Sequence, residues 1–77
     1  MIGPHYTLDE EFGARLRRLR IESCGWSMPS LAEESGVHRL TIFGIEHGSD
    51  PQLSTLLKLS QAMGMTLSEL VGDEYNG

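Results

Sequence analysis

The sequence predicts an all-α fold, a compact domain of five helices and no strand. Apolar residues recur at intervals of three and four along most of the chain, and glycines or short polar stretches separate the periodic segments. A length of 77 residues and a hydrophobic content of 39% are enough for one modest core. We expect a flexible N-terminal arm over 1–6, the helical domain over 7–72 and a frayed acidic tail over 73–77.

Composition limits where the protein works and what it binds. Six Lys and Arg residues against eleven Asp and Glu residues give a net charge of −5, which opposes DNA binding because phosphate neutralisation supplies much of its affinity. Cys24 is the only cysteine, which excludes an internal disulfide and fits a reducing compartment. No apolar run approaches the roughly 20 residues of a membrane span, and the N-terminus lacks the pattern of a signal peptide. We expect a cytoplasmic protein that does not associate with membranes.

Catalysis is not expected. The three histidines and the one cysteine do not follow a zinc-binding spacing. The sequence also contains no Gly-rich phosphate loop and no nucleophile motif. We therefore predict that the protein is not an enzyme and has no cofactor, no metal site and no small-molecule substrate.

The first helix is predicted over about 8–23. Thr7 and Glu10 match a capping box, in which a threonine caps the helix and a glutamate three residues later bonds back. Gly25 ends the segment. Its apolar positions are Leu8, Phe12, Leu16 and Leu19. Its arginines, which form either a solvated face or a contact to backbone phosphates, are Arg15, Arg17, Arg18 and Arg20.

Two short helical segments joined by a tight turn follow between Trp26 and Gly48. Ser27 or Met28 caps the first segment, and Pro29 falls in its first turn, where proline is tolerated. This pattern of helix, turn and helix is the outline of a helix-turn-helix, formed here by the second and third helices.

The turn is centred on Gly36, because glycine permits the positive φ that a tight turn requires. His38 stands at the N-cap position of the third helix, predicted over about 39–47, and Gly48 ends that helix. The side chains expected to face the core are Leu31, Ala32, Val37, Ile42 and Ile45.

Two further helices complete the domain. The fourth is predicted from apolar positions at helical spacing, and Gly64 closes it. Its inward positions are Leu53, Leu56, Leu57, Ser60 and Met63. Thr66 and Glu69 form a second capping box, which opens a short fifth helix. The apolar residues of the fifth helix are Leu67, Leu70 and Val71.

With these elements in place, the chain resembles the Cro/repressor-like (Xre-type, lambda-repressor-like) helix-turn-helix domains over about residues 12–71. The matching positions are Arg15–Arg20, Leu31–Glu33, Gly36–Val37, Thr41–Ile42, Ile45–Glu46, Gly48, Pro51, Leu56–Leu59, Ala62–Gly64 and Leu67–Leu70. The resemblance implies a prokaryotic or phage transcription regulator that forms a homodimer. It also implies that the third helix enters the major groove of double-stranded operator DNA.

The resemblance also supplies candidate DNA-binding residues. They are Ser27, His38, Arg39, Leu40, Thr41, Phe43 and His47, with Arg15, Arg17 and Arg18 as contacts to phosphate. Arg39 suits the O6 and N7 atoms of guanine, whereas Leu40 offers only apolar contact, for example to a thymine methyl group. Four positions depart from the residues usual in the family, namely Met28, Leu40, Phe43 and Gly44.

Glu46 is expected to be structural. The resemblance implies that it pairs with an arginine late in the first helix, for which Arg20 is the candidate. The interval from Arg20 to Gly25 is one residue longer than is usual in the family.

Two functions remain open at this point. The first is a sequence-specific DNA-binding transcriptional regulator, specifically a repressor. The second is a helix-turn-helix scaffold repurposed as a protein–protein interaction module, an antirepressor or an assembly partner, through Leu40 and Phe43. Phe43 either lies exposed beside Leu40 or packs against a neighbouring helix.

Overall fold

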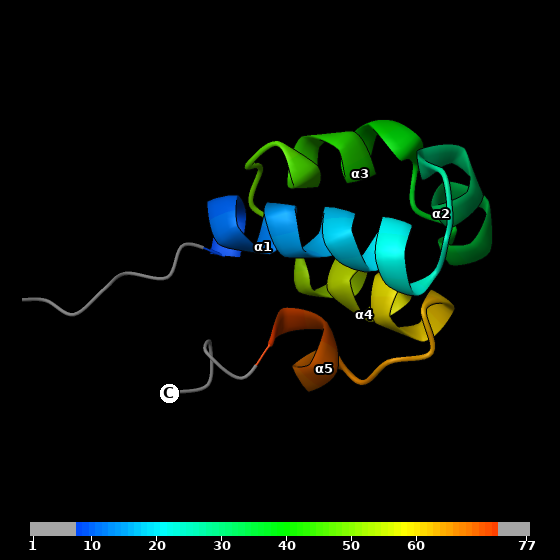
Figure 1. Cartoon of the computed structure of the whole chain (residues 1–77). Helices are drawn as coiled ribbons and strands as arrows, with labels where there is room; N and C mark the ends of the chain where they lie inside the picture. Colours follow the sequence, from blue (N-terminus) through cyan, green and yellow to red (C-terminus); the bar gives the residue numbers. More distant parts are fainter. Residues whose placement is uncertain (1–7, 73–77) are drawn as a thin grey trace, which may run out of the picture.

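A computed structural model describes residues 8–72 of the chain (Figure 1). The predicted arm, the N-cap at Thr7 and the acidic tail lie outside the described residues. The elements are α1 (Leu8–Arg18), a π-helical turn η1 (Leu19–Ser23), α2 (Met28–Ser35), α3 (Arg39–Glu46), α4 (Leu53–Ala62) and α5 (Leu67–Val71). Since no strand occurs within 8–72, the predicted all-α, five-helix fold is confirmed for that range. None of these helices is long and apolar enough to cross a membrane.

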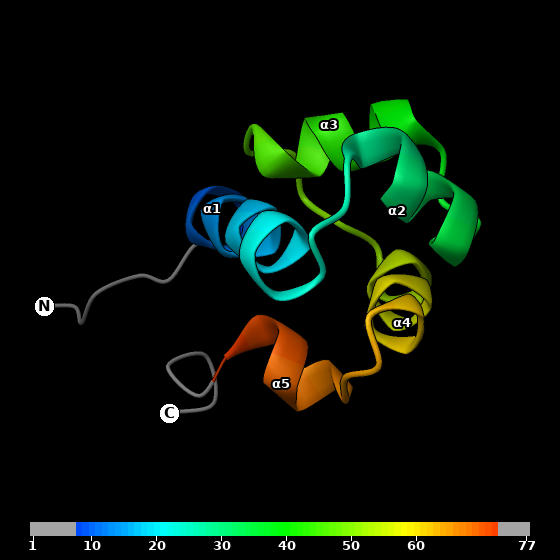
Figure 2. The ribbon, with the colours of Figure 1, turned by 45° about the vertical axis from the view of Figure 1, so that its right-hand side comes forward.

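The helices are arranged around α1. Figures 1 and 2 show α3 on one side of α1 and α5 on the other, while α4 lies beside α2 and α5. Every helix contributes at least one side chain to the shared core, which is why short helices that are marginal alone are stable here. The buried apolar residues are Phe12, Leu16, Leu31, Val37, Ile42, Ile45, Leu56, Leu59 and Leu70.

The first helix ends differently from a regular α-helix. Helical structure runs to Ser23 as predicted, but its last turn is the π-turn η1. The Cys24 N–H donates to the carbonyl of Leu19 at 3.1 Å, five residues back, and Gly25 then reverses the chain at φ 68°. A π-turn holds one more residue than an α-turn. The longer interval between Arg20 and Gly25 is therefore taken up inside η1.

α1 and α3 approach each other closely at Gly13. A Cβ atom at this position would collide with the main-chain carbonyl oxygen of Ile45 and would lie 3.0 Å from the carbonyl carbon of Glu46. Only glycine allows this contact between two helices, although it costs about 1 kcal/mol of helix propensity relative to alanine. Sequence reasoning did not single out Gly13; its signal was a glycine inside a helical apolar pattern.

The buried face of α4 differs from the prediction. Leu56 and Ser60 are buried as expected, but Leu59 is the third buried side chain. Leu53 and Leu57 are instead 61% and 42% exposed. Positions 56, 59 and 60 lie on one stripe of a helix with 3.6 residues per turn, and 53 and 57 lie on its flank. The large number of leucines in α4 concealed which stripe faces the core.

Candidate nucleic-acid interface

The turn between α2 and α3 is fixed by local hydrogen bonds. Ser27 is the N-cap of α2, because its Oγ accepts the Ser30 N–H at 3.2 Å, and Met28 is half-buried against the core. Gly36 takes the left-handed conformation at φ 76°, as its place in the turn requires. Val37 then returns to the core with 6% exposure. The helix-turn-helix outline predicted over Trp26–Gly48 is thus present.

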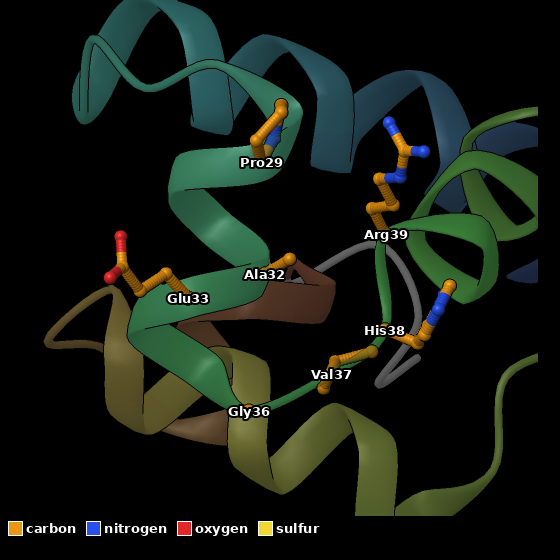
Figure 3. Close-up of a pocket in the computed structure, with 7 residues that line it drawn as sticks. All are labelled: Pro29, Ala32, Glu33, Gly36, Val37, His38 and Arg39. Carbon is orange, nitrogen blue, oxygen red and sulfur yellow. The ribbon is translucent and has the colours of Figure 1, made fainter.

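An open groove of about 460 Å³ lies in the angle between α2 and α3. Its lining residues are Pro29, Ala32, Glu33, Gly36, Val37, His38 and Arg39. Figure 3 shows the Arg39 side chain extending along the groove towards Pro29, whereas the Glu33 carboxylate points away on the opposite side of α2. Arg39 is therefore exposed at the start of α3 without being paired to the acid that lines the same groove.

His38 is the N-cap of α3, as predicted. Its Nδ1 accepts the Leu40 N–H at 3.1 Å, which satisfies one of the donors left free at the start of a helix. A neutral imidazole that accepts at Nδ1 carries its proton on Nε2. His38 is exposed, so the cap leaves one N–H donor of the ring available to a partner.

Leu40 and Phe43 are both exposed. Of the two alternatives for Phe43, exposure beside Leu40 is therefore the one observed, and not packing against a neighbouring helix. Leu40 is 67% exposed and Phe43 is 49% exposed. The inward side of α3 is occupied by Ile42 and Ile45, which leaves positions 40 and 43 facing outward, one turn apart. The Phe43 ring stacks on the ring of His47, with centroids 3.9 Å apart and an angle of 19° between the planes.

A second hollow of about 410 Å³ lies on the other side of Leu40, between α3 and the start of α4. Its lining residues are Leu40, Thr41, Gly44, Ile45, Ser49, Asp50, Pro51, Gln52 and Thr55. The Ser49 N–H donates to the Gly44 carbonyl at 2.8 Å, and a Cβ on Gly44 would lie 3.1 Å from the Ser49 Oγ. Sequence reasoning did not single out the polar residues Gln52 and Thr55 here, because it considered the fourth helix only for its apolar positions.

Glu46 and Arg20 form the predicted brace at the other end of α3. The guanidinium donates from Nε to Oε2 at 2.7 Å and from Nη2 to Oε1 at 2.9 Å, and Nη1 donates to the Trp26 carbonyl at 3.1 Å. The two side chains are 8% and 1% exposed. The hydrogen bonds to Glu46 raise the pKa of Arg20 above its already high ordinary value. This paired glutamate is the only acid within Arg39–Glu46, so the outward face of α3 carries no free carboxylate.

The helix-one arginines do not share one face. Arg15 donates from Nε to the Leu70 carbonyl at 2.8 Å and from Nη2 to the Glu69 carbonyl at 2.7 Å. These bonds direct Arg15 towards α5, which lies on the side of α1 opposite α3 (Figure 2). Arg18, three residues later, lies on the flank next to Arg15.

Arg17 lies on the other flank of α1. It is exposed. Gly13, four residues before it, and Arg20, three residues after it, both contact α3, and this spacing places Arg17 on the same side of the helix. Of the three arginines predicted to contact phosphate, Arg17 is therefore the nearest to the candidate interface, and Arg15 braces the fold.

Comparisons with known proteins agree with this geometry. The profile of the helix-turn-helix family matches residues 16–70. One curated relative, described as control protein C.MunI from a Mycoplasma species, is 38% identical over 63 residues, which is 80% of this chain and 85% of the relative. No solved structure matches the chain significantly. The chain belongs to the helix-turn-helix family of Cro/repressor-like, Xre-type domains, and it is a DNA-binding transcriptional regulator.

Proposed function

We propose that the protein is a sequence-specific repressor that places α3 in the major groove of operator DNA. The observation that carries the proposal is the outward face of α3, where Arg39, His38 and Thr41 present donors and no carboxylate is free. An α-helix fits the major groove, and an arginine at its start is well placed for O6 and N7 of a guanine. The description of the Mycoplasma relative as a control protein supports a regulatory role.

Phosphate contacts are proposed on both sides of α3. Ser27 stands at the start of α2, the Nε2–H of His38 is available at the start of α3, and Arg17 lies near its end. His47, exposed at the C-cap of α3, is a further candidate. Arg15 and Arg18 are left out of this proposed surface because Arg15 is bound to α5 and Arg18 shares its flank.

The active form is proposed to be a homodimer, because two copies related by a dyad bind two half-sites at once, and the second contact, being intramolecular, raises the overall affinity by about 10²–10⁴. The contact must leave α3 free for DNA. Leu53 and Leu57 lie one turn apart on α4 and are 61% and 42% exposed, so this apolar pair is the surface that we assign to the second copy. Replacing both with serine should convert the sedimenting species from dimer to monomer, and an unchanged dimer would place the contact elsewhere.

The test of DNA binding starts with selection of bound duplexes from a randomised library at low salt, followed by titration with increasing salt. We expect an enriched sequence containing guanine and a steep fall of affinity with salt. Arg39→Ala should weaken binding to the enriched duplex about 5- to 150-fold, which corresponds to about 1–3 kcal/mol for one bidentate base contact.

The matched control removes an exposed cation elsewhere, on α4. Lys58→Ala should change the affinity by less than about threefold, which is the weakening expected from one distant charge. Operator activity is then measured with a reporter gene behind the enriched sequence, where repression is expected. Failure of any duplex to bind at low salt would contradict the proposal.

The second candidate function is a protein–protein interaction module. The exposure of Leu40 and Phe43 favours it, because large apolar side chains side by side on a surface are frequent in protein interfaces. It predicts that Leu40→Ser abolishes association with a protein partner and that no duplex is enriched in the selection.

A further inference from the structure

The outward face of α3 carries two large apolar side chains where base contacts are proposed. Leu40 and Phe43 are 67% and 49% exposed, and neither belongs to the core or to the apolar residues packed against it. Exposed apolar surface of this kind is a cost in water that burial in a complex removes. The chemistry of these two side chains therefore limits what the face can recognise.

Phe43 is held in place before any partner binds. Its ring stacks on His47 with centroids 3.9 Å apart, and the His47 Nδ1 lies 2.8 Å from the Phe43 carbonyl oxygen. A carbonyl oxygen can only accept, so Nδ1 carries the hydrogen of this bond. The bond fixes the orientation of the imidazole and hence of the stack. Pre-organisation of this kind lowers the entropy lost on binding.

The surroundings of the apolar pair favour a polyanion over an apolar protein surface. Arg39 precedes Leu40, and His38 offers its Nε2–H on the same end of α3. The acid within α3, Glu46, is buried against Arg20. Two further carboxylates line the hollows beside α3, Glu33 between α2 and α3 and Asp50 next to Leu40. Donors and a cation therefore border the apolar pair on α3 itself.

We propose that Leu40 and Phe43 contact the C5-methyl groups of pyrimidines in the major groove, beside the guanine assigned to Arg39. This inference rests on the proposed function. The C5-methyl group is the apolar feature that the major groove presents, and it is carried by thymine. The methyl group of 5-methylcytosine occupies the same position on the ring. The ligand chemistry is thus a pyrimidine C5-methyl group, and the operator contains one at each position facing Leu40 or Phe43.

The test uses the duplex enriched by selection and the full-length chain. Each thymine is replaced in turn by deoxyuridine, which removes the methyl group and leaves the hydrogen bonds of the base pair unchanged. We expect one or two positions in each half-site where the replacement weakens binding about fourfold, equivalent to about 0.8 kcal/mol for one buried methyl group. Positions outside the contact should be insensitive.

Protein variants assign the sensitivity to residues. Leu40→Ser and Phe43→Ser should each remove the discrimination between thymine and deoxyuridine at one position and keep it at the other. Ile21→Ser is the matched control, since Ile21 is a 43% exposed apolar residue that belongs to η1 and not to α3, and it should keep the full fourfold effect. Circular dichroism and thermal melting confirm that the variants are folded.

A third set of duplexes separates the two sources of the methyl group. Cytosine and 5-methylcytosine, each paired with guanine, are placed at the sensitive positions. Recovery of affinity with 5-methylcytosine over cytosine would support recognition of the methyl group from either source, and recovery with thymine alone would support thymine as the source.

The inference is overturned if the chain binds the enriched duplex and no deoxyuridine replacement changes the affinity by more than twofold. It is also overturned if Leu40→Ser changes the oligomeric state in sedimentation without changing the response to deoxyuridine, which would make the pair a protein contact. Absence of binding to any duplex is a different result, because it contradicts the proposed DNA-binding function itself.

Discussion

Replacing Arg20 with methionine tests the brace that holds the C-terminal end of α3. Methionine keeps most of the aliphatic volume of arginine but removes the charge and all three hydrogen bonds to Glu46 and Trp26. The Glu46 side chain is 1% exposed, so its carboxylate would remain buried without a cation. Removing one partner of a buried pair typically costs about 3–5 kcal/mol.

That cost is large for this chain. A domain of 77 residues is expected to have a free energy of unfolding of about 4–12 kcal/mol. Arg20→Met should therefore lower the thermal midpoint by at least about 12 °C, at about 4 °C per kcal/mol. The assay is thermal and urea denaturation followed by circular dichroism. Arg17→Met is the control, because Arg17 is exposed on the same helix and its loss should change stability by less than about 0.5 kcal/mol.

A double variant separates the buried charge from the lost packing. Arg20→Met combined with Glu46→Leu removes both charges and should recover most of the lost stability, because an apolar pair of similar volume often replaces a buried ion pair at little cost. The Trp26 carbonyl still lacks its donor, so about 1 kcal/mol should remain lost. If the double variant is no more stable than Arg20→Met alone, the explanation by an unpaired buried carboxylate is wrong.

Three further predictions concern single positions. Gly13→Ala should lower the free energy of unfolding by at least about 2 kcal/mol, because the added Cβ meets the main chain of Ile45, which cannot shift without the rest of its helix. Urea denaturation measures this free energy, and an unchanged value would contradict the contact. Gly44→Ala should raise the free energy of unfolding by up to about 1 kcal/mol, because the added Cβ comes closest to the rotatable Oγ of Ser49, at 3.1 Å, and lies at ordinary contact distance, 3.6 Å, from the Ser49 Cβ; a loss measured in the same assay would contradict it. Burial raises the pKa of the Cys24 thiol, so the folded state favours the protonated form. Its contribution to stability is present below the unfolded pKa of about 8.5 and is lost as pH rises through the raised folded value. Cys24→Ser should flatten the alkaline fall in the melting temperature, and an unchanged fall would exclude the thiol.

The sequence predicted local features of the fold well because their causes are local. The N-caps Ser27, His38 and Thr66 each bond to a backbone N–H two or three residues away, so the residue type and its place before an apolar repeat were enough. The capping box at Thr66 and Glu69 is present with both of its bonds. The same locality allowed the positive φ of Gly36 to be predicted.

Features that depend on distant segments were predicted poorly. Arg15 was predicted either to be solvated or to contact phosphate, and the structure bonds it to carbonyl groups 54 and 55 residues away at the end of α5. No local pattern carries that information. Which leucines of α4 face the core depends likewise on how α4 packs against α2 and α5, and Leu53 and Leu57 were wrongly expected inside.

The sequence predicted which residues form the candidate interface, and their contacts with DNA remain predictions. The third helix over 39–47 followed from its N-cap, its apolar positions and Gly48, and the choice of DNA-contacting residues on it followed from the resemblance. Their exposure followed from Ile42 and Ile45 filling the inward side. The pairing of Arg20 with Glu46 also came from the resemblance. Sequence spacing alone could not show it, because the π-turn that preserves it has no simple sequence signal.

The π-turn at Leu19–Ser23 also bears on how the length of this chain can change. Arg20 lies within the turn and is bonded to Glu46 and to the Trp26 carbonyl. The three residues that follow it, Ile21, Glu22 and Ser23, are all exposed. The π-turn thus holds the additional residue between Arg20 and Gly25 while the bonds of Arg20 to Glu46 and Trp26 are made. The segment thus separates the length of the first helix from the position of α3, because the additional residue is accommodated before Gly25.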